Sequence, residues 1–160
     1  MKQIATILVA LLLASSALRA EKGVADPRVA PLLDAINKPY NIDSDGDYKL
    51  ILRFDDSRSQ LLYVNSNTNT FGNMEIREVW SPAVKADDGL TYDQMKRLLV
   101  HNDKVKIGAW RIMTMNGKDV AVYAVQMPAA SDAETLKNVI QAVSVTADEM
   151  EKEMLGTDDL

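Results

Sequence analysis

The sequence contains no cysteine and only one histidine, His101. Without cysteine the chain can form no disulfide bond, no thiol nucleophile and no thiolate metal site, so packing alone must stabilise it. A single histidine excludes paired-histidine metal motifs and leaves one residue that could serve a catalytic triad. His101 falls near the end of a predicted helix, where a partly exposed imidazole suits the helix dipole, and no Gly-x-Ser-x-Gly elbow accompanies it. We therefore interpret His101 as a non-catalytic residue.

Phosphate-binding loops and basic clusters are absent as well. The glycines stand alone, and the 18 basic side chains are outnumbered by 23 acidic ones without gathering in one segment, so binding of nucleic acid is not expected. Adjacent carboxylates occur at 55–56, 87–88 and 158–159, in predicted turns or at the C-terminus, where such pairs are usually solvated. The sequence therefore predicts a protein that is not an enzyme and has no catalytic, cofactor-binding or metal-binding residues and no cofactor.

The acidic segment 43–47, with the sequence DSDGD, has aspartates at alternate positions like the start of an EF-hand calcium loop. Its sixth position, which should be glycine, is Tyr48, and its twelfth, which should be a bidentate glutamate, is Phe54. The segment thus lacks both the sharp bend and the strongest ligand of a calcium loop. We interpret it as a hairpin turn between strands at 40–43 and 48–54.

The first 20 residues have the three parts of a secretory signal peptide. Lys2 provides the positive n-region, residues 4–13 are almost wholly apolar, and small residues lead up to Ala20. We predict cleavage after Ala20, with Ala17 as the alternative, and therefore a periplasmic or secreted protein. The apolar run of about 10 residues is shorter than the roughly 20 that a membrane-spanning helix needs, so stable membrane insertion after cleavage is not expected. An uncleaved membrane anchor is the less favoured interpretation.

Residues 21–160, about 140 in number, have the usual length of a single domain. Apolar residues recur at helical spacing from Val29 to Ile36, which predicts a helix that ends before Pro39. Pro31 fits the first turn of this helix, where its missing N–H costs no hydrogen bond.

The next segments have the patterns of strands. Apolar and polar residues alternate at 48–54, which predicts a half-buried strand, and a second strand is predicted at 60–65. The polar tract 65–70 is expected to be a loop. A third strand is predicted at 73–84, with a stop near Pro82.

A second helix and a hairpin are predicted in the following segment. Thr91 and Gln94 form a capping box, the pair of residues that satisfies the free N–H groups at a helix start. Two apolar segments rich in β-branched residues, 106–115 and 118–127, are joined by Asn-Gly at 116–117. This dipeptide tolerates positive φ and predicts a hairpin with a type I′ turn.

The last predicted helix runs to about Leu155. Ser131 and Glu134 repeat the capping-box pattern at its start. Apolar residues then alternate at steps of four and three, which predicts one stripe that another element must cover. The stripe consists of Leu136, Ile140, Val143, Ala147, Met150 and Met154.

The predicted order is α-β-β-β-α-β-β-α. This order predicts an α+β domain in which an antiparallel sheet is flanked by helices.

Two apolar features could mark a binding surface instead of core. Trp80 and Trp110 are expected on strands, and tryptophan is enriched at interface anchors. Met150 and Met154 lie among glutamates at the end of the last helix and could form an adaptable docking edge. For both pairs core packing is the favoured interpretation.

Several segments together resemble the YbjN family, which is described as bacterial sensory transduction regulators. They are 98–102 (LLVHN), 106–112 (KIGAWRI), 116–118 (NGK) with the aliphatic strand and acidic helix that follow, and the opening hairpin 40–47 (YNIDSDGD). The resemblance covers 29–155. It implies the fold of type III secretion chaperones, a compact α+β domain that is commonly dimeric, and no established active site. Typical members are cytoplasmic, so the export signal favours an envelope variant.

These features favour a non-enzymatic periplasmic binding or adaptor protein that engages a protein partner or itself, with a homodimer as one form. The alternative is a periplasmic binder of a small molecule or lipid, in which helices cover the apolar side of the sheet incompletely. An exported hydrolase is the least favoured of the three hypotheses.

Overall fold

The computed structural model describes residues 23–54, 57–86 and 88–156. The predicted signal peptide, with both candidate cleavage sites, and the acidic pairs at 55–56 and 158–159 lie outside these ranges. None of the helices within them is both long and apolar enough to span a membrane.

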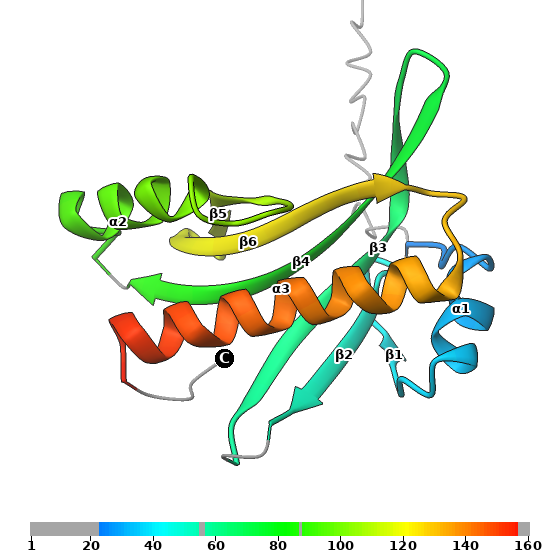
Figure 1. Cartoon of the computed structure of the whole chain (residues 1–160), viewed down its shortest axis with the longest axis horizontal. Helices are drawn as coiled ribbons and strands as arrows, with labels where there is room; N and C mark the ends of the chain where they lie inside the picture. Colours follow the sequence, from blue (N-terminus) through cyan, green and yellow to red (C-terminus); the bar gives the residue numbers. More distant parts are fainter. Residues whose placement is uncertain (1–22, 55–56, 87, 157–160) are drawn as a thin grey trace, which may run out of the picture.

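The described residues form one antiparallel sheet with helices on one of its faces (Figure 1). The strands lie in the order β1-β2-β3-β4-β6-β5, so β1 and β5 form the two edges. The predicted α+β class is confirmed, and β1 corresponds to the strand predicted at 40–43, which the predicted order of elements did not count. In chain order the elements are α1 (Val29–Ala35), β1 (Asn41–Ile42), β2 (Tyr48–Arg53), β3 (Ser59–Phe71), β4 (Met74–Ala86), α2 (Tyr92–Asn102), β5 (Ala109–Met115), β6 (Lys118–Pro128) and α3 (Ala133–Met154).

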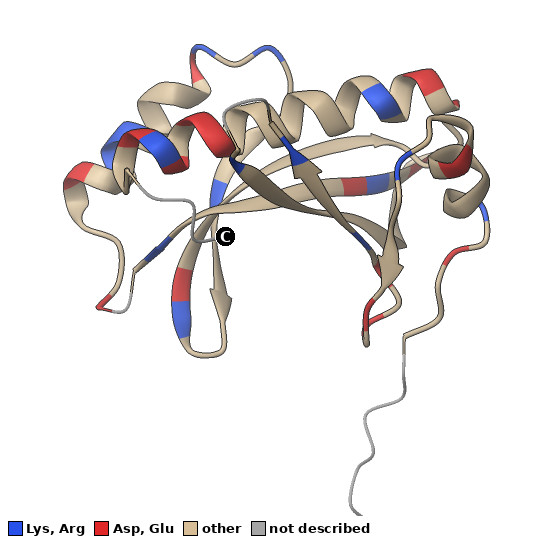
Figure 2. Ribbon diagram, turned by 90° about the horizontal axis from the view of Figure 1, so that it is seen from below, with Lys and Arg blue, Asp and Glu red and all other residues tan. Residues whose placement is uncertain are grey.

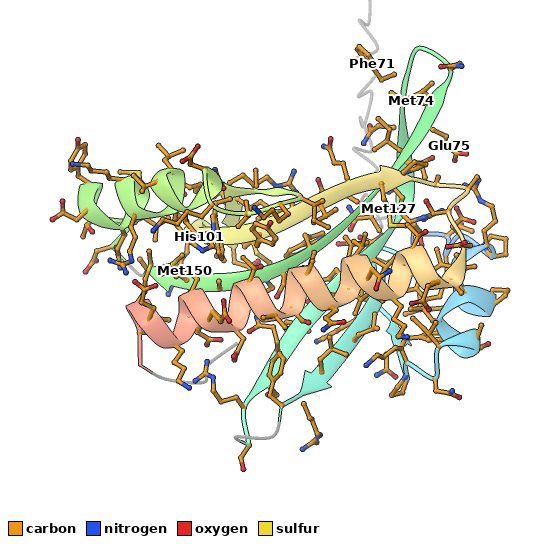
Figure 3. All side chains as sticks on the ribbon, viewed as in Figure 1. Phe71, Met74, Glu75, His101, Met127 and Met150 are labelled. Carbon is orange, nitrogen blue, oxygen red and sulfur yellow. The ribbon has the colours of Figure 1, made fainter. Side chains whose placement is uncertain are left out.

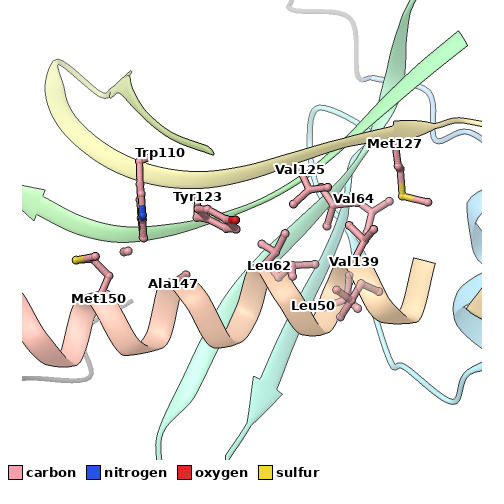
Figure 4. Close-up of a cluster of buried hydrophobic side chains, with 14 of the residues drawn as sticks. Leu50, Leu62, Val64, Trp110, Tyr123, Val125, Met127, Val139, Ala147 and Met150 are labelled. Atoms are coloured by element: carbon pink, nitrogen blue, oxygen red, sulfur yellow. The ribbon is translucent and has the colours of Figure 1, made fainter. Parts of the chain in front are cut away.

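The main core lies between the sheet and α3. The predicted stripe of α3 faces the sheet: Leu136, Ile140, Val143, Ala147 and Met150 are all buried. They pack against inward-facing residues of the strands (Figure 4), and α1 and α2 extend the same layer (Figure 2). Core packing is therefore confirmed for these five residues, while Met154, the last residue of the stripe, is partly buried at the edge of the same core.

Three predicted local motifs can be compared directly with the structure. The capping box of α2 is confirmed, because Thr91 accepts from the backbone N–H of Gln94 and the Gln94 side chain accepts from that of Thr91. The Asn-Gly turn is confirmed as well, with positive φ at both positions. The capping box predicted for α3 is wrong. Asp132 caps this helix by accepting from Thr135, and the Ser131 hydroxyl donates instead to the carbonyl of Pro128.

The loop predicted at 65–70 is also wrong, since β3 continues through it to Phe71. This half of the strand pairs with β4 as far as Phe71 opposite Met74, forming a hairpin arm that projects beyond the sheet (Figure 3). A projecting arm is solvated on both faces, so its sequence has no apolar alternation from which a strand could be predicted.

β4 does not stop at Pro82 but continues to Ala86. Proline is tolerated in this interior strand because the β3–β4 ladder has already ended at Tyr63 opposite Trp80, and the pairing with β6 shifts register just after Pro82. Side chains replace the missing ladder. The Gln60 amide donates to the Pro82 carbonyl at 2.7 Å and to the hydroxyl of Ser81, which in turn donates to β3.

We predict that Ile140→Ala lowers the free energy of unfolding by about 2 to 5 kcal/mol, because it leaves a cavity between α3 and the sheet. Asn138→Ala, on the exposed side of the same helix, serves as the control and should change stability by less than about 0.5 kcal/mol. Urea unfolding followed by circular dichroism measures both. Equal stability of the two variants would contradict the assignment of the stripe to the core.

Candidate functional site

A cluster of charged side chains lies where the hairpin arm leaves the sheet. Here Val64 pairs with Val79 but the next pair is Thr68 with Arg77, so three residues of β3 bulge out opposite one residue of β4. The Arg77 side chain is only 3% exposed. Its guanidinium fills the bulge, donating to the main-chain carbonyls of residues 65 and 66 and to the carboxylate of Asp26.

The residues before α1 close this cluster. Asp26 accepts a second guanidinium, that of Arg28, which also bonds Glu75 on the arm at 2.7 Å. The Ser66 hydroxyl accepts from the backbone N–H of Asp26, and the backbone N–H of Ser66 donates to Asp47 at 2.7 Å. We call this group the hairpin-root cluster; it consists of Asp26, Arg28, Asp47, Ser66, Glu75 and Arg77.

The surroundings lower the pKa of two carboxylates in this cluster and raise the pKa of a third. Hydrogen bonds from the Arg28 side chain hold the pKa of Asp26 well below its ordinary value and lower that of Glu75 to about 2. Burial raises the pKa of Asp47. The cluster joins the residues before α1 to the acidic turn 43–47 and to the arm. Because its charged groups bond one another and the backbone, we interpret it as structural.

We predict that Asp26→Asn destabilises the protein at pH 7 by about 1 to 3 kcal/mol, the range for losing hydrogen bonds to a charged group. The lowered pKa means that the ionised Asp26 stabilises the fold above its unfolded-state value near 3.8, and that this contribution is lost as the pH falls below it. The difference between wild type and variant should therefore shrink between pH 5 and about 2. A difference that is independent of pH would contradict this role.

A second candidate is the outer surface of α2 and β5. β5 is an edge strand of the sheet, and α2 packs beside it on the helix side. Between them lies an apolar groove of about 240 Å³. Large apolar side chains around it are exposed, with Tyr92 at 72%, Leu99 at 67% and Ile112 at 44%. The groove is lined by Met95, Leu98, Leu99, Trp110, Arg111 and Ile112. We call this region the α2–β5 surface.

Side-chain hydrogen bonds fix α2 against the start of β5. The indole N–H of Trp110 donates to Nδ1 of His101 at 2.9 Å, and the backbone N–H of Trp110 donates to the side chain of Asn102 at 2.7 Å. Gly108, just before β5, allows the backbone there to come close to β6. Its φ is 78°, and a Cβ atom there would lie 2.5 Å from the carbonyl oxygen of Ala124.

The structure gives His101 a specific partner that sequence reasoning did not predict. Its ring lies at the end of α2 and also borders a hollow of about 310 Å³ between α2 and the end of α3. Charges of both signs line this hollow, and Arg97 pairs with Glu153 across it. Because Nδ1 accepts from Trp110, the imidazole joins the end of α2 to β5.

We predict that His101→Leu lowers the free energy of unfolding by about 1 to 3 kcal/mol, because it leaves the buried indole N–H of Trp110 without an acceptor. His101→Gln, which retains an acceptor oxygen, should be less destabilising. Urea unfolding of the two variants beside the wild type measures the difference. If His101→Leu were as stable as the wild type, the hydrogen bond would contribute nothing.

The remaining residues singled out in the sequence lie apart from one another. Trp110 is buried on the helix side of the sheet, and Trp80 is buried on the opposite side, where it stacks on Tyr63.

In the acidic turn, Asp43 accepts from the backbone N–H groups of Asp45 and Asp47. β1 and β2 pair on either side of this turn, so the predicted hairpin turn is confirmed. In the described ranges no three acidic or histidine side chains gather closely enough to hold a metal ion.

Comparison with protein-family models and with curated proteins found no match to this chain.

Proposed function

We propose that this chain is a non-enzymatic binding or adaptor protein of the periplasm or extracellular space that engages a protein, in the first place a second copy of itself. The observation that carries the proposal is the α2–β5 surface, where an edge strand lies beside an exposed apolar groove. An edge strand presents unpaired N–H and C=O groups and can therefore accept another strand.

β5 has little of the protection that edge strands usually carry. Soluble proteins discourage edge pairing with lysine, proline, bulges or very short strands. β5 contains neither lysine nor proline, is seven residues long and pairs with β6 without a register shift. Near its start the backbone N–H of Trp110 donates to Asn102 of α2, so the edge that can accept a strand is the part after Trp110. The other edge, β1, has only two residues. The sequence of β5 is thus better explained if a partner strand covers it.

The sequence of β5 also suits pairing with itself. An antiparallel pair centred on Ile112 places Ala109 opposite Met115, Trp110 opposite Thr114 and Arg111 opposite Met113, so no like charges face each other. A shift of the centre to Arg111 would bring two arginines together, which is unfavourable. A two-fold pair centred on Ile112 is therefore the preferred arrangement.

The proposed compartment depends on the signal-peptide pattern of the first 20 residues, and the resemblance to the YbjN family supports a role in regulation without catalysis. The hydrogen bond from Trp110 gives His101 a structural role, because it joins α2 to β5. α3 is a weaker candidate for self-association, since Met150 is 2% exposed and Met154 is partly buried against the chain's own core.

We predict that the chain lacking residues 1–20 is a dimer at micromolar concentrations and that Ile112→Asp converts it to a monomer, because two carboxylates would meet at the centre of the pair. Ile51→Asp places the same substitution on an exposed residue of β2 and should leave the dimer intact. Size-exclusion chromatography with light scattering measures the mass, and circular dichroism checks the fold. A wild type that remains monomeric up to about 1 mM, or a dimer that survives Ile112→Asp, would refute this interface.

A further inference from the structure

The face of the sheet opposite the helices carries a second apolar cluster. Its buried members are Trp80, Val120, Val122 and Ala124, with Tyr63, Met113 and Met115 packed beside them. Within the described ranges this cluster includes no helical residue. We call this side of the sheet the open face. It lies on the side of the strands away from the helices in Figure 2.

One row of apolar side chains crosses the open face from strand to strand. Ile51 of β2 lies opposite Leu61 of β3, and Pro82 of β4 lies opposite Val122 of β6. Leu61 and Pro82 join the two halves, since both line one hollow. Ile51 is 57% exposed, whereas Val122 is fully buried at the other end of the row. Pro82 is buried as well, so the accessible part of the row is the end formed by Leu61 and Ile51, and this part is the shallow apolar track.

An aromatic pair borders one side of this track. Tyr63 and Trp80 lie directly opposite each other in the ladder, and their rings stack at 4.4 Å with an angle of 14° between the planes. The indole N–H of Trp80 donates to Asn65 at 2.8 Å. Since the indole N–H is bonded, the ring faces of the stacked pair form a flat apolar wall.

Basic residues border the other side of the track. Arg53 lies two positions after Ile51 in β2. Lys85 of β4 lies opposite Val120 of β6, and Lys118 lies two positions before Val120, at the start of β6. Lys85 and Lys118 also line the hollow of about 210 Å³ whose remaining walls are Leu61, Pro82, Met115, Asn116 and Val120.

Three basic side chains thus lie along this border, in a chain whose formal net charge is −5. Of the carboxylates near this face, Glu78 is bonded to Arg111, and Asp43 and Asp47 lie near Tyr63, on the aromatic side of the track and not on the basic side. A ligand that carries a negative charge and a hydrocarbon chain therefore matches both the basic border and the apolar track, and the acidic remainder of the surface would repel it.

We propose that the open face binds a single-chain anionic amphiphile, such as a fatty acid. Its alkyl chain lies along the track from Leu61 towards Ile51, against the stacked rings, and its charged group lies at Lys85 and Lys118. This site is separate from the α2–β5 surface, so it does not depend on the proposed dimer.

The proposal is tested by isothermal titration calorimetry of laurate, below its critical micelle concentration, into the chain lacking residues 1–20. We expect saturable binding with one laurate per chain, weakened about tenfold or more in Ile51→Asp and in Lys85→Gln. Lys85→Gln changes only an exposed side chain and so keeps the test valid if Ile51→Asp fails to fold. The matched control Ile112→Asp should bind laurate like the wild type, whether or not it is a dimer.

Dodecylphosphocholine has an alkyl chain of similar length but no net charge and should bind at least about tenfold more weakly than laurate. Equal binding of the two, or laurate binding that neither Ile51→Asp nor Lys85→Gln weakens, would overturn the proposal. Binding to anionic phospholipid vesicles or to an acidic peptide without binding to monomeric laurate would overturn it as well.

Discussion

The structure depends first on the packing of α3 against one face of the antiparallel sheet. The stripe from Leu136 to Met150 is buried against strands that are far apart in the sequence, and the other two helices join the same apolar layer. With no cysteine in the chain, this burial has to provide most of the stability. Because all the described helices are on this side, none of them covers the opposite face, and α2 caps the β5 edge only near its start, where Asn102 accepts from the backbone N–H of Trp110.

The hairpin-root cluster provides hydrogen bonds that the bulge of the long β3–β4 hairpin requires. An arm of this length leaves the sheet through a bulge, and a bulge leaves carbonyl groups without ladder partners. Arg77 satisfies two of them and is itself neutralised by Asp26, which belongs to the segment before α1. A residue at the start of the described chain therefore determines how the arm is held, although more than 50 positions separate the two in sequence.

The sequence was sufficient for the elements whose patterns reflect burial on one side, such as α2, α3 and the β5–β6 hairpin. Prediction from the sequence failed at positions where contacts between distant residues determine the local structure. Pro82 is tolerated inside β4 only because Gln60 replaces the ladder, and Asp132 rather than Ser131 caps α3. Likewise, no local pattern pairs His101 with Trp110, because nine positions separate them and the bond forms only when α2 meets β5. The α2–β5 surface was missed since its exposed apolar residues have the same periodicity as core residues.

The two proposed surfaces are geometrically compatible. Antiparallel pairing of two β5 strands about a two-fold axis perpendicular to the sheet continues the sheet from one copy into the next. Such an axis keeps the helix layers of both copies on one side and both open faces on the other. Trp110 and Ile112 point to the helix side, so the two α2 helices would meet there, where Leu99 is exposed. Arg111 and Met113 point to the open side, so the dimer would leave both apolar tracks uncovered and facing the same direction.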